Sequence, residues 1–190
     1  MTDRLLPVLC LVWFVSELCV TLSCVTQRSG PRATSKDRGS LSVIGLATAV
    51  SLGCGIVVAY HFPAWGLPTR HLFLILGVGV FVVGLALRLC SIFYLGRFFT
   101  GKVAIATDHR LVDSGPYRFV RHPSYTGALM LFIGLGLVIG NWLSLVVIIP
   151  PVFAAYWWRM RIEEAALAEA LGDPYRCYMK RTKRLVPMIF

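Results

Sequence analysis

The sequence predicts an all-α integral membrane protein with five transmembrane helices, of which the last two form a tight helical hairpin, and with a cytosolic C-terminal helical cap. Composition is the first reason. Hydrophobic residues make up 57% of the chain and charged residues only 15%, and the mean hydropathy of +0.72 is far above that of a soluble domain. The second reason is that the apolar residues gather in long runs separated by polar, basic segments.

Three apolar runs in the N-terminal half are long enough to cross a hydrocarbon core about 30 Å thick. They are Leu5–Val25, Leu41–Phe62 and Leu72–Tyr94. The first is longer than the apolar core of a cleaved signal peptide, so we interpret it as an anchor. Its single charge, Glu17, must face the bundle or lie near an interface. Arg88, in the third run, is close enough to the cytoplasmic end to snorkel there, but an inward-facing position is the alternative.

The next two apolar runs predict an antiparallel hairpin. Tyr125–Gly140 and Leu143–Trp158 are each short for a membrane span, and Gly140-Asn141-Trp142 leaves room only for a tight turn between them. We therefore expect the two helices to lie side by side.

The tail beyond Trp158 predicts two further helices. Glu163–Leu171 is rich in alanine and glutamate and is followed by Gly172, a residue typical of helix ends. Asp173-Pro174 then provides a cap and a first-turn proline for another helix. That helix places Tyr175 and Tyr178 on one face, where paired aromatic residues usually serve packing.

Basic residues concentrate in segments 27–40, 96–122 and 159–184. Because Lys and Arg gather on the cytoplasmic side of membrane proteins, we place these segments in the cytoplasm and the N-terminus outside. The membrane would be the cell inner membrane in a prokaryote and the endoplasmic reticulum in a eukaryote. The net charge of +10 does not indicate nucleic-acid binding, because the basic residues flank apolar runs instead of forming one face of a soluble domain.

Two patterns that could indicate other functions are better explained by packing. Of the six cysteines, five lie within apolar runs, and the chain has no CxxC or metal-ligand spacing, so we expect no metal or redox site. The glycine-rich stretches Gly77–Gly84 and Gly134–Gly140 superficially match a nucleotide-binding fingerprint. They lie inside membrane runs, where glycines let neighbouring helices approach closely.

The polar loop Asp108–Tyr125, caught between apolar runs, is the natural place for chemistry. His122-Pro123 marks a helix start, so backbone amides near Ser124 and Tyr125 are expected to be free to hold an anionic group such as a carboxylate.

Arg159 and Glu163 lie on the same side of the membrane as this loop. They are four residues apart on one helical face, and their spacing taken by itself favours a simple ion pair. A shared pocket at the cytoplasmic interface would combine them with Tyr117, His122 and Tyr125.

Several motifs together resemble the isoprenylcysteine carboxyl methyltransferase family and the related phospholipid N-methyltransferases. In chain order they are HRLVDSGPY (His109–Tyr117), RHPSYTG (Arg121–Gly127), R-I-E-E-x-x-L (Arg161–Leu167), L-G-x-x-Y-x-x-Y (Leu171–Tyr178) and R-T-x-R-L-V-P (Arg181–Pro187). The resemblance covers roughly residues 93–187, about half of the chain.

This resemblance implies a membrane enzyme that binds S-adenosylmethionine in a cytosolic pocket and releases S-adenosylhomocysteine. The acceptor would be a lipidic substrate, such as a prenylated C-terminal cysteine, that enters from the bilayer among the membrane lipids. Residues 1–95 would then form a scaffold of three transmembrane helices, and residues 96–190 the catalytic region.

The resemblance also assigns site residues. The family's cofactor contacts fall on His109, Arg110, Leu111, Val112, Tyr117, His122, Pro123, Ser124, Tyr125 and Glu163. The arginine that holds the substrate carboxylate falls on Arg159, the expected catalytic residue. The chain departs from the pattern at Lys102, where some members have a glutamine that touches the cofactor.

Two alternative functions remain beside carboxyl methylation. Methylation of a phospholipid amine such as phosphatidylethanolamine needs a base to deprotonate the ammonium, a role for Glu163, Glu164 or His122. A carboxylate acceptor is already ionised and needs alignment instead, and Arg159 would repel an ammonium, so we favour the carboxyl acceptor. A non-catalytic membrane partner is the third hypothesis.

Overall fold

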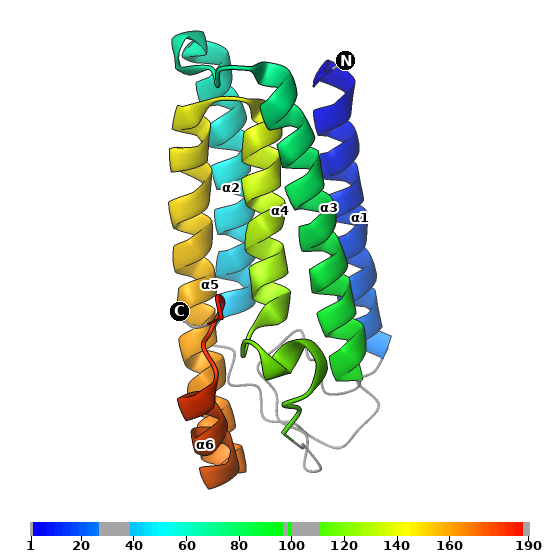
Figure 1. Ribbon diagram of the computed structural model, residues 1–190, viewed down its shortest axis with the longest axis vertical. Coiled ribbons are helices and arrows are strands. Elements are labelled where there is room, and N and C mark those ends of the chain that lie inside the picture. Colours follow the sequence, from blue (N-terminus) through cyan, green and yellow to red (C-terminus); the bar gives the residue numbers. More distant parts are fainter. Residues whose placement is uncertain (1, 27–38, 97–98, 100–110, 188–190) are drawn as a thin grey trace.

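The computed structural model describes residues 2–26, 39–96, 99 and 111–187. Within these ranges the chain is helical, with two isolated β-bridges. Its helices are α1 (Thr2–Thr26), α2 (Ser40–His61), η1 (Pro63–Trp65), α3 (Arg70–Leu95), η3 (Gly115–Arg118), α4 (Pro123–Ile139), α5 (Trp142–Leu171) and α6 (Asp173–Arg181). The long helices stand side by side and alternate in direction, and α6 lies at one end (Figure 1). We call this the α6 end of the bundle.

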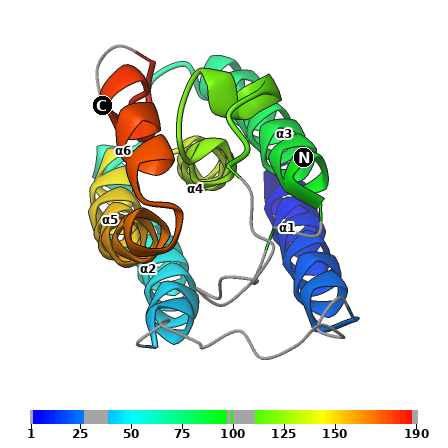
Figure 2. The same cartoon turned by 90° about the horizontal axis from the view of Figure 1, so that it is seen from below.

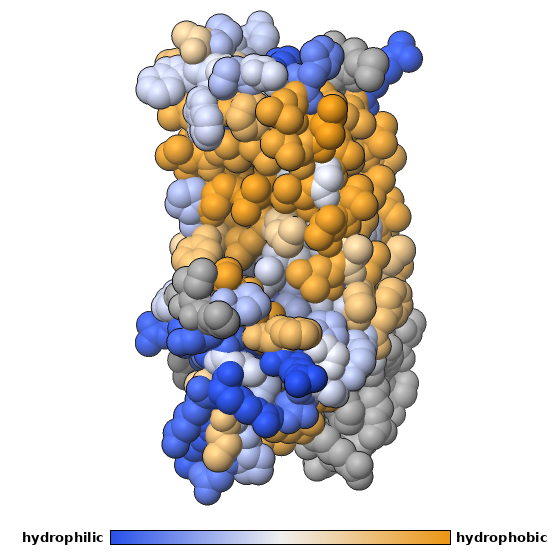
Figure 3. Space-filling view, viewed as in Figure 1, coloured by the Kyte–Doolittle hydropathy of each residue, from blue (hydrophilic) through white to orange (hydrophobic). Residues whose placement is uncertain are grey.

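The surface of the bundle is apolar along most of its length. Large apolar side chains such as Leu46, Ile75 and Val146 are 67%, 68% and 64% exposed, and the space-filling view shows an apolar belt between two polar ends (Figure 3). Exposure of such a surface is unfavourable in water but favourable in contact with lipid. Helices α1, α2, α3 and α5 are long and apolar enough to cross a membrane. The chain is therefore a multi-pass membrane protein.

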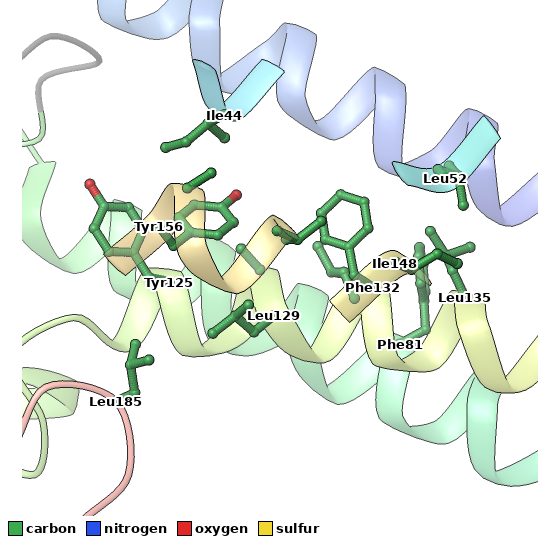
Figure 4. Close-up of a cluster of buried hydrophobic side chains, with 14 of the residues drawn as sticks. Ile44, Leu52, Phe81, Tyr125, Leu129, Phe132, Leu135, Ile148, Tyr156 and Leu185 are labelled. Carbon is green, nitrogen blue, oxygen red and sulfur yellow. The ribbon is translucent and has the colours of Figure 1, made fainter. Parts of the chain in front are cut away.

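The fourth predicted span, Tyr125–Gly140, corresponds to α4, a shorter apolar helix of 17 residues that forms the core of the bundle. It lies between α3 and α5 in both views (Figures 1 and 2). Its side chains Leu131 and Leu135 are 0% exposed and Phe132 is 1% exposed. They pack against Phe81 of α3 and Ile148 of α5 in one apolar cluster (Figure 4).

Glycines bring α3 and α4 into close contact. A Cβ atom on Gly134 would lie 2.7 Å from the carbonyl oxygen of Gly77, and one on Gly127 would lie 2.6 Å from that of Gly84. No real Cβ atom tolerates these distances to backbone. The interpretation of the glycine-rich stretches as helix-packing surfaces is thus confirmed for this pair of helices.

The predicted hairpin joins α4 to α5 through a turn at Gly140 and Asn141. Gly140 has a φ of 78°, a conformation that favours glycine. The Asn141 carboxamide caps α5 by accepting from the backbone N–H groups of Leu143 (2.9 Å) and Ser144 (3.2 Å). Its Nδ2 also donates to the carbonyl oxygen of Phe62 (2.9 Å), so one side chain ties the hairpin to the end of α2.

The tail differs from the prediction in one respect. The expected helix Glu163–Leu171 is not separate but continues the membrane helix without a break, so α5 is 30 residues long. Alanine, leucine and glutamate all favour helix, and the helix stops at Gly172, where φ is 62°. After it, α6 lies against α5, with Tyr175 and Tyr178 each 3% exposed, as their predicted packing role requires (Figure 2).

Replacement of Gly134 by alanine should destabilise the bundle, because the added methyl group would collide with the backbone of α3. Overpacking of this kind typically costs about 1–3 kcal/mol. We expect a clearly lower midpoint of thermal unfolding in detergent. Gly79→Ala in α3 is the matched control, since a Cβ atom there has no neighbour within 4 Å. Equal midpoints for the two variants would contradict a close contact between α3 and α4.

Candidate active site

A layer of polar side chains, four of them buried and Glu17 half-buried, crosses the bundle near the α6 end. Each of the five long helices contributes to it, through Glu17 (α1), Ser40 (α2), Arg88 (α3), Tyr125 (α4) and Arg159 (α5). Polar groups at this depth are costly unless they pair with one another, and they usually mark a functional region in a membrane protein.

Tyr125 joins Arg159 to Glu163 at the centre of this layer. The Nε of Arg159 donates to the Tyr125 hydroxyl (2.8 Å), and that hydroxyl donates to Oε2 of Glu163 (2.7 Å). The Nη1 of Arg159 also donates to the Ser40 hydroxyl (2.8 Å). Arg159 is 4% exposed, whereas the Glu163 side chain is 30% exposed. The simple ion pair expected from their spacing is thus replaced by a link through tyrosine.

His122 packs on this link from the loop side. Its ring stacks on that of Tyr125, with centroids 5.3 Å apart and planes 12° apart. Its Nε2 lies 3.2 Å from Oε1 of Glu164, and its Nδ1 lies 3.9 Å from Oε2 of Glu163. An ionised carboxylate can only accept a hydrogen bond, so Nε2 carries a proton and Nδ1 faces the Glu163 side.

Glu164, which is 3% exposed, anchors this histidine and two arginines. Its carboxylate accepts from Nε of Arg121 (2.9 Å) and from both Nε (3.0 Å) and Nη2 (2.7 Å) of Arg184. Arg121 further donates to the carbonyl oxygens of Met179 and Thr182. One buried carboxylate therefore joins the loop before α4, helix α5 and the segment after α6.

The backbone strengthens this connection. The N–H groups of Arg121 and His122 donate to the carbonyl oxygens of Lys183 (2.8 Å) and Arg184 (3.0 Å). The Thr126 hydroxyl donates to the carbonyl oxygen of Leu185 (2.8 Å). The segment after α6 is thus fastened along the start of α4.

Tyr117 connects η3 to its surroundings. Its hydroxyl donates to the carbonyl oxygen of Ser91 in α3 (3.2 Å), and its own carbonyl oxygen accepts from the Tyr178 hydroxyl (2.6 Å). Burial raises the pKa of Tyr178 to about 12 and also raises the pKa of Tyr117. Both phenols therefore stay protonated at neutral pH and remain donors.

Arg88 faces inward, so the snorkelling interpretation is wrong and the inward-facing alternative is right. It is 7% exposed, and its Nε lies 2.8 Å from Oε1 of Glu17. Its Nη1 donates to the carbonyl oxygen of Ser124 (3.3 Å). An arginine deep in the bundle cannot reach water, and the carboxylate of Glu17 offers it a closer partner.

The structure brings four of the predicted site residues into one connected cluster: His122, Tyr125, Arg159 and Glu163. Pro123 and Ser124 are buried beside them at the start of α4, and Tyr117 lies within electrostatic range of Glu163. Leu111 and Val112 lie before η3 and are half-buried. The predictions for His109, Arg110 and Lys102 fall outside the described residues.

One expectation for the start of α4 needs correction. The amide of Tyr125 is not free, because it donates to the carbonyl oxygen of His122 (3.0 Å). The short loop at Pro123 turns tightly enough to close this hydrogen bond, which reduces the room for an anion there.

Sequence reasoning missed several residues of the polar layer. Ser40 is the last residue of a polar segment and Tyr156 lies in an apolar run, and nothing in the pattern singles out either residue. The anchoring role of Glu164 was not foreseen. Two features of the sequence could have indicated the role of Glu164. One is the adjacent pair Glu163-Glu164, because neighbouring acids on a helix can contact different partners, and the other is the arginines of the motif Arg181–Pro187.

Fold and site together define a multi-pass membrane protein with a buried cation, a carboxylate and stacked aromatic rings at one end of its bundle. A family model described as phospholipid methyltransferase matches residues 72–174. The chain belongs to this family.

Curated relatives and a solved structure are similar to the chain. It is 32% identical over 114 residues to a protein-S-isoprenylcysteine O-methyltransferase of Schizosaccharomyces pombe, covering 59% of this chain and 48% of that protein. It is 31% identical over 141 residues to the enzyme of the same name from Saccharomyces cerevisiae, covering 70% and 59%. The structure of a eukaryotic intramembrane Ras methyltransferase, isoprenylcysteine carboxyl methyltransferase, matches with a TM-score of 0.61 at 28% identity, covering 76% of this chain and 52% of that one. The chain thus spans about half the length of the relatives it matches.

Replacement of Glu164 by glutamine should destabilise the fold, because Arg121, Arg184 and His122 would lose their shared anion. Breaking a buried ion pair on one side typically costs about 3–5 kcal/mol. We expect a large drop in the thermal unfolding midpoint in detergent. Asp173→Asn is the control, since its ion pair with Arg176 is solvent-exposed and should contribute little. If Glu164→Gln unfolds at the wild-type temperature, Glu164 is not the anchor described above.

Proposed function

We propose that the protein is an S-adenosylmethionine-dependent carboxyl O-methyltransferase whose acceptor is the carboxylate of a lipidic molecule, such as a prenylated C-terminal cysteine. The observation that carries this proposal is the buried guanidinium of Arg159, held by Tyr125 and Ser40 at the polar end of a membrane bundle. The names of the relatives support the same acceptor class.

Arg159 would bind and orient the acceptor carboxylate. A guanidinium that is 4% exposed has lost most of its water and sits where the effective dielectric constant is low, so it attracts an anion strongly. Hydrogen bonds to Tyr125 and Ser40 hold two of its nitrogens, which limits its rotation. The orientation of the acceptor would therefore be set before the reaction.

The residues beside Arg159 suit a cationic methyl donor. The carboxylate of Glu163 is partly exposed and fixed by Tyr125, and the stacked rings of His122 and Tyr125 offer an aromatic face next to it. Anions and aromatic faces both attract ammonium and sulfonium groups. S-adenosylmethionine, when bound, would supply an electrophilic methyl group on its sulfonium. We propose His122, Pro123, Ser124, Tyr125, Glu163, Tyr117, Leu111 and Val112 as its contacts among the described residues.

Little acid–base chemistry would be needed. A carboxylate acceptor is ionised at neutral pH, so no side chain has to remove a proton from it. The protein would accelerate transfer by holding the acceptor in line and by excluding water around it. The neutral link between Arg159 and Glu163 fits this task, because Tyr125 separates the group proposed for the acceptor from the group proposed for the donor.

We further propose that the α6 end is cytosolic and that the N-terminus lies outside. The exposed side chains of Arg118, Arg161, Arg176, Lys180, Arg181 and Lys183 gather there, as the positive-inside rule requires. Residues 96–190 would supply most of the catalytic region. The N-terminal helices would do more than form a scaffold, because Ser40 and Arg88 contact Arg159 and Ser124 of that region.

Methylation of a phospholipid amine is the second candidate function, and the description of the matching family favours it. Glu163 is exposed enough to take up a proton from an ammonium acceptor. The buried cation of Arg159 weighs against an ammonium acceptor beside it.

Arg159→Ala and Arg159→Lys should abolish or nearly abolish methyl transfer to a carboxylate acceptor, while binding of S-adenosylmethionine is largely retained. The measurement is transfer of labelled methyl groups by purified protein in lipid, with N-acetyl-S-farnesylcysteine and phosphatidylethanolamine offered separately. Calorimetry follows donor binding. Arg161→Ala, which removes an exposed arginine two residues along the same helix, serves as the control and should keep wild-type activity.

The chemistry of the labelled product separates the two functions. A methyl ester loses its label in mild base, whereas a methylated amine keeps it. A base-stable label, or full activity of Arg159→Ala, would refute the proposed function.

A further inference from the structure

Helix α1 lies at the edge of the bundle, next to α3, and most of its surface faces outward (Figures 1 and 2). Only 6% of its membrane-spanning segment is buried, against 39% for α5. Leu9, Trp13 and Glu17 are four residues apart and therefore share the face that meets the bundle. Leu9 is 7% exposed, and the Trp13 ring packs edge-on against that of Phe132 in α4, with centroids 5.3 Å apart.

The charge of Glu17 distinguishes this docked position of α1 from others. Apolar contacts favour it little, because the lipid chains that they replace are equally apolar. The Glu17 carboxylate, in contrast, accepts a hydrogen bond from Nη2 of Arg88 (2.8 Å), and its Oε1 lies 2.8 Å from Nε of the same arginine. Turning this face of α1 toward lipid would separate the two charges in a medium of low dielectric constant. The ion pair therefore fixes the depth and the rotation of α1.

Arg88 also contacts the start of α4. The backbones of α3 and α4 meet at this residue, since a Cβ atom on Gly127 would lie 2.7 Å from the backbone nitrogen of Arg88. One turn earlier on α4, the carbonyl oxygen of Ser124 accepts from Nη1 of Arg88 (3.3 Å). A guanidinium can bind both partners because its N–H groups point in fixed, different directions in one plane. One buried side chain thus connects α1 to the first turn of α4.

We propose that Glu17 and Arg88 are positioning residues for the active site. Glu17 orients the Arg88 guanidinium, and Arg88 holds the first turn of α4 where Ser124 and Tyr125 contact the methyl donor. This inference rests on the proposed function, since it explains how two of the proposed donor contacts are held. Docking of α1 by itself explains the ion pair but not the second hydrogen bond of Arg88. Helix α1 is then required for donor binding, although it precedes residues 72–174, which match the family model.

Arg88→Lys separates docking from positioning. Lysine keeps the charge that pairs with Glu17 but lacks the planar group that also reaches Ser124. The Kd for S-adenosylmethionine, measured by calorimetry in lipid nanodiscs, should rise about 10-fold, as expected for loss of one hydrogen bond from a charged group. Glu17→Gln should raise this Kd to a similar extent. The thermal unfolding midpoint of Arg88→Lys should change little. Arg70→Gln is the matched control, because Arg70 is exposed at the opposite end of α3.

The double variant Glu17→Gln/Arg88→Gln tests whether Glu17 acts through Arg88. In that case Glu17→Gln raises the Kd no further once Arg88 is replaced, whereas two independent residues would have additive effects. Additive effects, or a wild-type Kd in both Glu17→Gln and Arg88→Lys, would overturn the proposal. If the double variant does not fold, these two single variants decide the question.

Two further outcomes are distinguishable. A lower unfolding midpoint with unchanged donor affinity in Glu17→Gln and Arg88→Lys would assign the pair to stability alone, which overturns this inference and leaves the proposed function intact. A wild-type protein that does not bind S-adenosylmethionine would refute the proposed function, and this inference with it.

Discussion

The carboxylate of Glu164 holds together three parts of the chain that are far apart in sequence. It pairs with Arg121 before α4 and with Arg184 after α6, and it accepts a hydrogen bond from His122. Because Glu164 is nearly fully buried, loss of any of these partners would leave a buried charge unpaired, at a large cost in free energy of folding. The position of His122 then sets that of Tyr125 through the stacked rings, and Tyr125 orients Arg159. The geometry of the whole site therefore depends on this one anion.

The two adjacent glutamates have divided roles for a physical reason. Glu164 is surrounded by cations and is almost closed to solvent, so it is committed to structure. Glu163, one residue earlier, accepts a hydrogen bond from the neutral Tyr125 hydroxyl and remains partly exposed. A carboxylate in the second situation keeps its capacity to attract a cationic ligand. Arg159 donates hydrogen bonds to the hydroxyls of Tyr125 and Ser40, which fix the orientation of its guanidinium group.

Much of the fold and part of the site could be predicted from local sequence. Apolar runs marked the membrane helices, Gly140-Asn141 marked the hairpin turn, and Tyr175 and Tyr178 were correctly assigned to packing. The grouping of His122, Tyr125, Arg159 and Glu163 was predicted from their motifs, and the structure shows these four residues in contact at one end of the bundle. Ser40, Tyr156 and the inward direction of Arg88 could not be foreseen, because each depends on which helix face a neighbour covers.

The sequence by itself determined that this chain is a helical membrane protein with its chemistry at one end, since long apolar runs can bury their backbone polar groups in lipid only as helices. It also indicated that the helices carrying Gly77, Gly84 and Gly134 can approach a neighbour closely, and the structure shows that these helices, α3 and α4, approach each other. Only the tertiary structure decided the partners of the charged groups. Electrostatic pairing acts across space between segments that are distant in the chain, so the choice of Glu17 for Arg88, or of Glu164 for Arg184, depends on how the helices are placed beside one another.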